Sequence, residues 1–378
     1  MRVLLVGEYS VLHNSLKEGL QMLGHEVKLI GNSDGFKQYP VDYDYEAKWL
    51  KKKAFTTLRK IFYRLFKFDL ADLEYGIRFY FLLPKLKKFD VVQFINEASI
   101  KTTTKIEIYL IRKILKENKK SFVLTSGVDY LTLKFYIENK DYKSLLQPYF
   151  KDSKLKEFNS FFSYFSKGHI KIHRFIQSNF NGLIATDFDY IDAARKSPIF
   201  SAYIPYPINV SKLKFEKLKI EDKIIIFLGI NKYSYHQKGI VYFENALKII
   251  EQKFKNKVEI IITNTIPYSE YIELYNSAHI LLDQAYCNDQ GYNALEAMAK
   301  GKVVFTGAEQ EFINYYNITD KVCINALPNV DYLVNELSYL IENPNEIVAI
   351  GHRARAFVEK EHDYIKIAKK YLNIWEEK

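Results

Sequence analysis

The residues best placed to do chemistry lie in one stretch of the chain, residues 278–306, which reads AHILLDQAYCNDQGYNALEAMAKGKVVFT. An apolar run is followed by a polar loop, Gly291, a helix of small residues that carries Glu296, and a second apolar run. Parallel α/β sheets bind ligands at the carboxyl ends of their strands. A helix start at that edge offers free N–H groups and a partial positive charge, which suit a diphosphate. The stretch therefore predicts a site for a phosphorylated ligand.

Four positions in this region are candidate ligand contacts. Asp283 and Gln284 end the first apolar run, where side chains either contact a ligand or cap the following loop. Glu296 lies about one turn into the helix, from which its carboxylate can reach a ribose hydroxyl pair. The alternative for Glu296 is a capping acid or a solvated helix residue. Gly307 follows the second run, and its missing side chain would let the backbone approach the ligand.

A loop earlier in the chain offers positive charge. An apolar run at 224–228 predicts a strand, and a Lys-Gly pair precedes a helix predicted at 242–254. A lysine in such a strand-to-helix loop is a flexible point charge suited to a phosphate. Each charged hydrogen bond of this kind contributes roughly 1.5–3 kcal/mol. The candidates in this loop are Gly229, Asn231, Lys232 and, as the strongest, Lys238.

The stretch 278–306 resembles the signature of bacterial GT-B glycosyltransferases of the glycosyltransferase family 4 (group 1) type. That signature has two glutamates with seven residues between them, and the second is followed by Ala-Met-Ala and Gly-Lys. Asn288 stands where the first glutamate belongs, and Asp289 follows it. The second half of the signature is matched by Glu296, Ala297, Met298, Ala299, Gly301 and Lys302.

The resemblance implies a GT-B fold, in which two Rossmann-like doubly wound α/β domains face a cleft. It implies that the second domain binds a nucleotide-diphosphate sugar, with Glu296 on the ribose and Lys238 on the diphosphate. Asn288 or Asp289 would lie near the sugar. It also implies transfer of a hexose-type sugar with retention of configuration, without a metal ion or other cofactor. Further donor-side positions are Gly291 and Tyr292 at the helix start.

The rest of the chain supplies the elements that position these residues. Its 378 residues exceed a single comfortable core and suggest two domains. Short apolar runs predict buried parallel strands, and helical spacing between them predicts two successive doubly wound units. The predicted strands are 2–7, 26–30, 91–95, 122–125 and 183–186, then 224–228, 258–263, 280–283, 303–306 and 322–325.

The sequence Pro-Tyr-Pro at 205–207 marks the boundary between the two units. Two prolines force extended backbone, so we predict an acceptor-side domain at 1–207 and a donor domain at 208–360. The end of the chain, 361–378, holds a helix with one apolar face. In GT-B proteins such a helix crosses back onto the first domain. A surface helix of the second domain is the alternative.

The acceptor would enter over the first domain. His13 lies near the end of the first strand, where it also fits a helix-start histidine without a catalytic role. Relatives place a cleft histidine after a mid-domain strand, where Asp129 is the nearest polar residue of this chain. Asn96 and Glu97 end another strand and are further candidates. The loop that faces the cleft in GT-B folds here holds Gly7, Glu8, Tyr9, Ser10 and His13.

Several other chemistries are disfavoured. The loop after the first strand lacks the Gly-x-Gly-x-x-Gly fingerprint, which argues against a nicotinamide or flavin enzyme. The triplets 42–44 and 187–189 read Asp-x-Asp, but we interpret the first as loop and the second as a helix cap. Cys287 and Cys323 lack metal-ligand spacing, and two thiols in so long a chain suit a reducing cytosol. We therefore expect a cytoplasmic protein without a metal ion.

Residues 46–67, EAKWLKKKAFTTLRKIFYRLFK, form a basic aromatic segment. It holds eight Lys or Arg against one Glu, which is +7 of the net charge of +10. Such a segment suits an anionic membrane surface, at about 1 kcal/mol for each cation, and would place the protein at the inner face of the cell membrane. The equal alternative is a helix with its apolar face in the core. Nucleic acid ranks third, because no recognition module accompanies the charge.

Together these features predict a glycosyltransferase that moves a sugar from a nucleotide-diphosphate sugar to a hydroxyl group. The acceptor would be a glycan or a lipid-linked molecule, in bacterial surface polysaccharide or lipid-linked glycan synthesis. A GT-B epimerase or hydrolase of nucleotide sugars is an alternative that would keep Glu296 but need no acceptor. A non-catalytic peripheral membrane or carbohydrate-binding protein is another.

Overall fold

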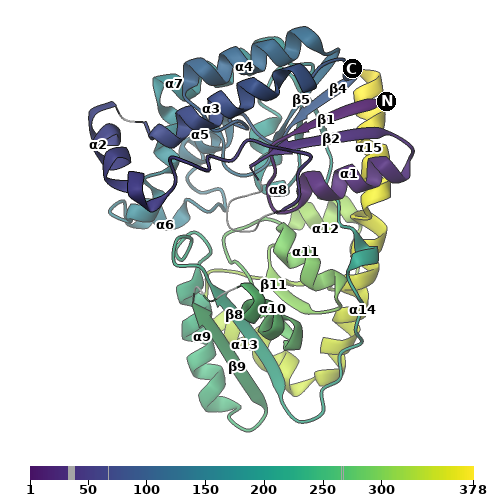
Figure 1. Cartoon of the computed structure of the whole chain (residues 1–378). Helices are drawn as coiled ribbons and strands as arrows, with labels where there is room; N and C mark the ends of the chain where they lie inside the picture. Colours follow the sequence, from purple (N-terminus) through teal and green to yellow (C-terminus); the bar gives the residue numbers. More distant parts are fainter. Residues whose placement is uncertain (33–38, 67, 265, 267) are drawn as a thin grey trace.

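Two parallel β-sheets, each covered by helices, form the two halves of the protein (Figure 1). The first sheet has seven strands in the order β3-β2-β1-β4-β5-β6-β7, and the second has five in the order β12-β11-β10-β8-β9. Neighbouring strands are parallel throughout. This confirms the predicted α/β class with two doubly wound units. The computed structural model describes residues 1–32, 39–66, 68–264, 266 and 268–378.

The strands coincide with the apolar runs, as expected for parallel strands buried on both faces. The first sheet consists of β1 (Arg2–Val6), β2 (Glu26–Gly31), β3 (Tyr43–Asp44), β4 (Val91–Phe94), β5 (Lys120–Thr125), β6 (Gly182–Ala185) and β7 (Phe200–Tyr203). The second consists of β8 (Ile224–Ile230), β9 (Val258–Asn264), β10 (Ile280–Leu282), β11 (Val303–Thr306) and β12 (Ile324–Asn325).

The helices connect successive strands and continue beyond the last one. The first half holds α1 (Leu12–Met22), α2 (Thr56–Phe66), α3 (Leu70–Leu82), α4 (Thr104–Glu117), α5 (Tyr130–Glu138), α6 (Gln147–Lys151), α7 (Lys167–Asn179) and α8 (Phe188–Ala194). The second holds α9 (Ile240–Lys253), α10 (Tyr268–Ser277), α11 (Tyr292–Ala299), α12 (Gln310–Tyr316), α13 (Val330–Glu342) and α14 (Pro344–Glu361), and α15 (Tyr364–Glu377) ends the chain.

Each sheet reverses its strand order at one point, and such switch points are where open α/β sheets bind ligands. In the first sheet β1 pairs with β2 on one side and with β4 on the other. In the second sheet β8 pairs with β9 and with β10. The loop after β1 therefore lies next to the loop after β4, and the loop after β8 lies next to the loop after β10. These loops carry most of the predicted acceptor and donor residues.

The last helix, α15, packs along α1 in the first half (Figure 1, yellow). Its start lies so close to α1 that a Cβ on Gly19 would come 2.3 Å from the carbonyl oxygen of Tyr364. Near its end, the fully buried Trp375 donates its indole N–H to Gln93 Oε1 at 3.2 Å. The chain thus returns from the second half to the first. The domain limits proposed above stay predictions.

The basic aromatic segment lies on the surface over residues 46–66, and residue 67 falls outside the described residues. Its helix α2 buries none of its side chains. Trp49 and Leu65 are 70% and 69% exposed. The alternative that the apolar face of this segment packs in the core is therefore wrong. Within the described part of the chain, every helix is too short or too polar to cross a bilayer.

Candidate active site

A small polar pocket lies at the switch point of the second sheet. Gly229 belongs to the end of β8, Asp283 follows β10, and Lys238 comes from the loop before α9. Helix α11 closes the pocket with Asn293 and Ala297. The volume is about 30 Å³, which is room for a single water molecule. Three of the predicted donor residues therefore meet at this point.

An ion pair lies in this pocket, with Lys238 Nζ 2.8 Å from Asp283 Oδ1. The Asp283 side chain is 6% exposed and that of Lys238 is 32% exposed. Burial lowers the pKa of Lys238, but the charge and hydrogen bond of Asp283 outweigh it, so the net shift is upward. The lysine is therefore a cation at neutral pH. An ammonium group has three N–H donors, so it can hold Asp283 and a phosphate oxygen at once.

Glu296 lies on α11, three residues after Asn293, which lines the pocket. This spacing puts the two side chains on the same face of the helix. The Glu296 side chain is half-buried, and its charge helps to raise the pKa of Tyr292 after the larger effect of burial. Gly291 caps the helix from extended backbone with ψ 167°. The predicted ribose and diphosphate contacts thus belong to one short helix beside the ion pair.

A larger pocket of about 330 Å³ lies where the two halves meet. Tyr9 and Ser10 of the loop after β1 line one side, and Tyr292 of α11 lines another. The hydroxyl groups of Tyr292 and Ser15 are 2.7 Å apart, which ties α11 to α1. The predicted acceptor loop and the start of the predicted donor helix therefore share one cavity. Its aromatic walls are Tyr9, Tyr164, Tyr190, Tyr206 and Tyr292.

Three residues predicted on the acceptor side support the loop instead of lining this pocket. The buried Glu8 carboxylate accepts the backbone N–H of His13 at 3.4 Å and that of Asn14 at 2.8 Å. His13 Nδ1 bonds to the carbonyl oxygen of Gly7 at 2.7 Å, and burial lowers the pKa of His13 to about 3. Gly7 has a φ of +87°, and a Cβ there would come 2.3 Å from Ile95. These contacts fix the backbone that presents Tyr9 and Ser10.

Asp129 belongs to a buried cluster next to the pocket. Its carboxylate caps α5 by accepting the N–H of Thr132 at 2.7 Å, and burial with the charge of Glu97 raises its pKa to about 6. Glu97 lies 2.5 Å from His173 Nδ1 and 3.3 Å from His169 Nε2. Neither histidine was predicted from the sequence. Their one signal there was the four-residue spacing, which puts them on the same face of α7.

Other predicted donor residues lie outside the small pocket. Asn231 and Lys232 occupy an exposed turn after β8, where Asn231 Oδ1 accepts a backbone N–H at 3.0 Å. A Cβ on Gly291 would come 3.8 Å from the side-chain nitrogen of Gln284. A Cβ on Gly307 would come 2.5 Å from the backbone nitrogen of Asp289. The missing side chain of Gly307 is therefore needed for loop packing.

Asn288 and Asp289 contact the first half of the protein. Asn288 donates its backbone N–H and its side-chain amide to Asp189 Oδ1, both at 2.7 Å. Asp289 Oδ2 accepts the N–H of Phe188 at 3.2 Å. As predicted, Asp187 caps α8, by accepting the N–H of Asp189 at 2.7 Å. Asn288, which stands at the position of the family's first glutamate, thus contacts the Asp-x-Asp triplet at 187–189.

Residues 242–373 match a protein-family model described as glycosyl transferase-like. A search of curated proteins gives no match. Sucrose-phosphate synthase from Thermosynechococcus elongatus has a similar structure, with a TM-score of 0.61, 13% identity, and coverage of 100% of this chain and 98% of that one.

Two further solved structures cover both chains completely. HepE of Anabaena in complex with UDP and glucose has a TM-score of 0.60 and 10% identity. UDP-GlcNAc 2-epimerase from Neisseria meningitidis bound to UDP-GlcNAc has a TM-score of 0.50 and 14% identity. Identities this low show the fold alone, and that fold is GT-B, as the sequence predicted. Together with the family match in the second half, it supports a GT-B glycosyltransferase.

Proposed function

We propose that this protein is a retaining, metal-independent hexosyltransferase of the glycosyltransferase family 4 type. It moves a sugar from a nucleotide-diphosphate donor to a hydroxyl group on a glycan or lipid-linked acceptor. The observation that carries the proposal is the meeting of Lys238, Asp283 and the start of α11 at the switch point of the second sheet. A cation and a helix start at one strand edge are what a diphosphate requires.

The donor lies across this edge in the proposal. Glu296 accepts hydrogen bonds from the ribose hydroxyl groups, Lys238 and the N–H groups that follow Gly291 hold the diphosphate, and no metal ion is needed there. HepE is recorded with UDP and with UDP-glucose, so uridine is the first base to test. The sugar then points toward the pocket of about 330 Å³ between the two halves, where the acceptor hydroxyl arrives beside Tyr9.

The chemistry rests on electrostatic stabilisation. Departure of the diphosphate leaves positive charge on the sugar and places negative charge on the phosphate, next to the cation at Lys238. Preorganised charges of this kind supply the largest share of the rate in many enzymes. For retention, the leaving phosphate takes the proton of the acceptor hydroxyl on the same face of the sugar. Closure of the cleft excludes water and protects the donor from hydrolysis.

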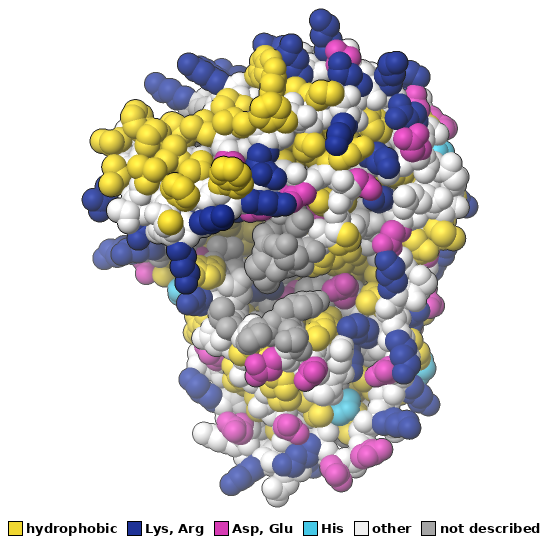
Figure 2. All heavy atoms as spheres, viewed as in Figure 1, with side chains coloured by type: hydrophobic (Ala, Val, Ile, Leu, Met, Phe, Trp, Pro, Cys, Tyr) yellow, Lys and Arg dark blue, Asp and Glu magenta, His cyan; other side chains and the backbone are white. Residues whose placement is uncertain are grey.

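The exposed basic aromatic segment supports a membrane-bound acceptor. Figure 2 shows hydrophobic side chains gathered over α2 and the adjoining part of α3, with Lys and Arg around them. Leu65 and Phe81 are 69% and 72% exposed. Apolar area flanked by cations suits an anionic bilayer. The proposal therefore places the protein at the inner face of the bacterial cell membrane, in surface polysaccharide or lipid-linked glycan synthesis.

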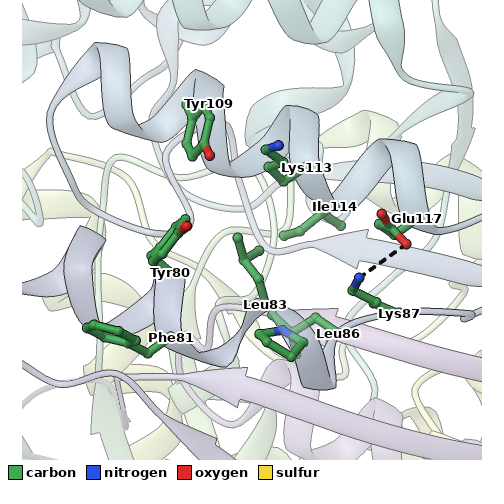
Figure 3. Close-up of a pocket in the computed structure, with 10 residues that line it drawn as sticks. Tyr80, Phe81, Leu83, Leu86, Lys87, Tyr109, Lys113, Ile114 and Glu117 are labelled. Atoms are coloured by element: carbon green, nitrogen blue, oxygen red, sulfur yellow. Dashed lines mark ion pairs between the residues drawn. The ribbon is translucent and has the colours of Figure 1, made fainter.

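A groove between α3 and α4 continues this surface. It has a volume of about 290 Å³ and is lined by Tyr80, Phe81 and Tyr109, with Lys113 one turn beyond Tyr109 on α4 (Figure 3). An ion pair between Lys87 and Glu117 at 3.5 Å closes one end. Aromatic rings with polar tips favour the boundary between lipid and water. The groove therefore extends the proposed membrane-facing surface beyond α2.

The alternative function is epimerisation or hydrolysis of a nucleotide sugar. It is favoured by the fold shared with the Neisseria epimerase, which was solved with UDP-GlcNAc. Product analysis of each donor with and without a lipid-linked or glycan acceptor separates the two functions. A transferase gives a glycosylated acceptor and a free nucleoside diphosphate. An epimerase gives an isomeric nucleotide sugar without acceptor.

The first experiment is a thermal-shift panel of UDP-, GDP-, ADP- and CMP-sugars, each with EDTA and with a divalent metal. Ligands that bind only the folded state raise the melting temperature. The proposal expects one nucleotide to raise it in EDTA. A panel without any shift would reject the donor site.

A further inference from the structure

Three carboxylates meet at the junction of the two halves. Asp187 and Asp189 lie at the start of α8, and Asp289 lies in the loop before α11. One oxygen of each lies within 4.8 Å of the others. Helix capping accounts for Asp187 alone. The sequence-based interpretation of this triplet as only a helix cap therefore leaves the cluster unexplained.

These carboxyl groups lie in a place with little compensating positive charge. Asp187 and Asp289 are 4% and 6% exposed. Among the residues that the structure describes, Lys, Arg and His form no ion pair with these three acids. Lys143, whose charge acts on Asp189, is itself paired with Glu309 at 2.5 Å. Buried like charges at such distances are strongly unfavourable unless a proton or a cation joins them.

The hydrogen bonds around the cluster orient its oxygens. Asp189 Oδ1 accepts both nitrogens of Asn288 at 2.7 Å, and Asp289 Oδ2 accepts the N–H of Phe188 at 3.2 Å. Asp187 Oδ1 accepts the N–H of Asp189 at 2.7 Å, and its Oδ2 accepts a weaker bond from Tyr206 at 3.4 Å. Asp289 Oδ1 is buried, and among the described residues it receives no hydrogen bond from an N–H or hydroxyl group. An oriented carboxylate oxygen without a partner, beside two other carboxylates, points to a bound ligand.

We propose that Asp187, Asp189 and Asp289 bind one hard divalent cation, Mg²⁺ or Mn²⁺, between the two halves. Carboxylate oxygens are the ligands that such ions prefer. The cation neutralises the buried charge and gives Asp289 Oδ1 its missing partner. It would also fix Asn288, which Asp189 holds at the position of the family's first glutamate. The site is separate from the diphosphate pocket at Lys238 and stands on its own contacts, whichever reaction the protein performs.

The test is cation binding by the full-length chain after treatment with EDTA. Isothermal titration and thermal shift are recorded with MgCl₂ and MnCl₂, and KCl at equal ionic strength controls for screening. The proposal expects saturable binding of one Mg²⁺ or Mn²⁺ and a higher melting temperature. Asp289→Asn should weaken binding about tenfold or more, because even the loss of a residue that only orients a metal ligand costs about 10–100-fold in affinity. The matched control is Asp44→Asn, from the other Asp-x-Asp triplet, where Asp44 pairs with Lys48 at 2.6 Å.

A second variant guards against misfolding of the first. Asp187→Asn removes a different carboxylate, and the far-ultraviolet circular dichroism of each variant reports its fold. The same titrations with UDP in EDTA report the donor site separately, so that failure of one site does not imply failure of the other. The proposal is overturned if the wild type shows no saturable cation binding, or if both variants bind cations as tightly as Asp44→Asn does. Either result would mean that these three carboxyl groups are not a cation site.

Discussion

The hydroxyl group of Tyr292, at the start of α11, lies 2.7 Å from that of Ser15 in α1. This hydrogen bond joins the helix that carries Glu296 to the first half of the protein, at the rim of the pocket between them. Because the two residues are far apart in sequence, the contact exists only when the halves are together. It therefore reports directly on contact between the two halves. Tyr292→Phe removes one partner, and such a loss costs about 0.5–1.5 kcal/mol.

We expect Tyr292→Phe to shift the equilibrium toward an open cleft without unfolding either half. Small-angle scattering should give a larger radius of gyration for the variant than for the wild type in the absence of donor. Tyr339→Phe, an exposed site on α13, is the control. An unchanged radius of gyration would show that this hydrogen bond does not hold the halves together.

Glu296→Ala should weaken binding of the nucleotide donor about 10- to 100-fold, because a carboxylate contributes roughly 1.5–3 kcal/mol through charged hydrogen bonds. The side chain is half-buried, so the melting temperature without ligand should change little. Titration calorimetry measures the affinity. Glu251→Ala, an exposed site on α9, is the control. Equal affinities for Glu296→Ala and Glu251→Ala would remove Glu296 from the ribose site.

Lys238→Met should abolish donor binding and also destabilise the fold. It leaves Asp283 buried without its partner at 2.8 Å. Breaking a buried pair costs about 3–5 kcal/mol, and the exposure of Lys238 puts this case at the low end. The double variant with Lys238→Met and Asp283→Asn should recover much of the free energy of unfolding that Lys238→Met alone loses. Urea unfolding measures this recovery. Donor binding should not return. Donor binding that survives in the double variant would show that the pair is only structural.

The basic aromatic segment should bind anionic vesicles. Trp49→Ser with Leu65→Ser should weaken that binding at least about tenfold, because each large apolar side chain contributes roughly 1.5–3 kcal/mol when buried. Both side chains are about 70% exposed, so the variant should stay folded and soluble. Vesicle sedimentation measures binding, and Met22→Ser, at a site 67% exposed on α1, is the control. Equal sedimentation of the two variants would place the membrane surface elsewhere.

Stability should fall in acid partly because His13 is buried. Its pKa is lowered from 6.5 to about 3 in the folded state, so the unfolded chain binds the proton more readily. The contribution of His13 to the unfolding free energy is therefore intact above pH 6.5. It declines below that by about 1.4 kcal/mol per pH unit, until about pH 3. Urea unfolding from pH 7 to pH 4 should show a shallower slope for His13→Gln than for His352→Gln, a change at an exposed site.

Much of the fold follows from local patterns in the sequence. Parallel strands buried on both faces appear as apolar runs, so strands such as β1 and β8 could be located within a residue or two. Short elements carried no such signal, because β3 has only two residues and β7 does not coincide with a long apolar run. The residues Gly229, Lys238 and Asp283 could be grouped because the ends of neighbouring parallel strands share one edge.

The remaining parts of the site depend on contacts between distant segments. The pairing of Glu97 with His173, and of Asp189 with Asn288, joins residues separated by 76 and 99 positions. Spacing within a single sequence does not show such contacts. For the same reason, the role of Glu8 and His13 as supports beneath the predicted acceptor loop was visible only after folding placed them in the interior.

The donor site is tested most directly by a crystal structure with the nucleotide that gives the largest thermal shift. We expect the ribose hydroxyl groups to lie within about 2.7–3.2 Å of the Glu296 carboxylate. We also expect the diphosphate to contact Lys238 and the N–H groups at the start of α11. A nucleotide bound away from α11, or with its ribose turned from Glu296, would contradict the proposed donor site.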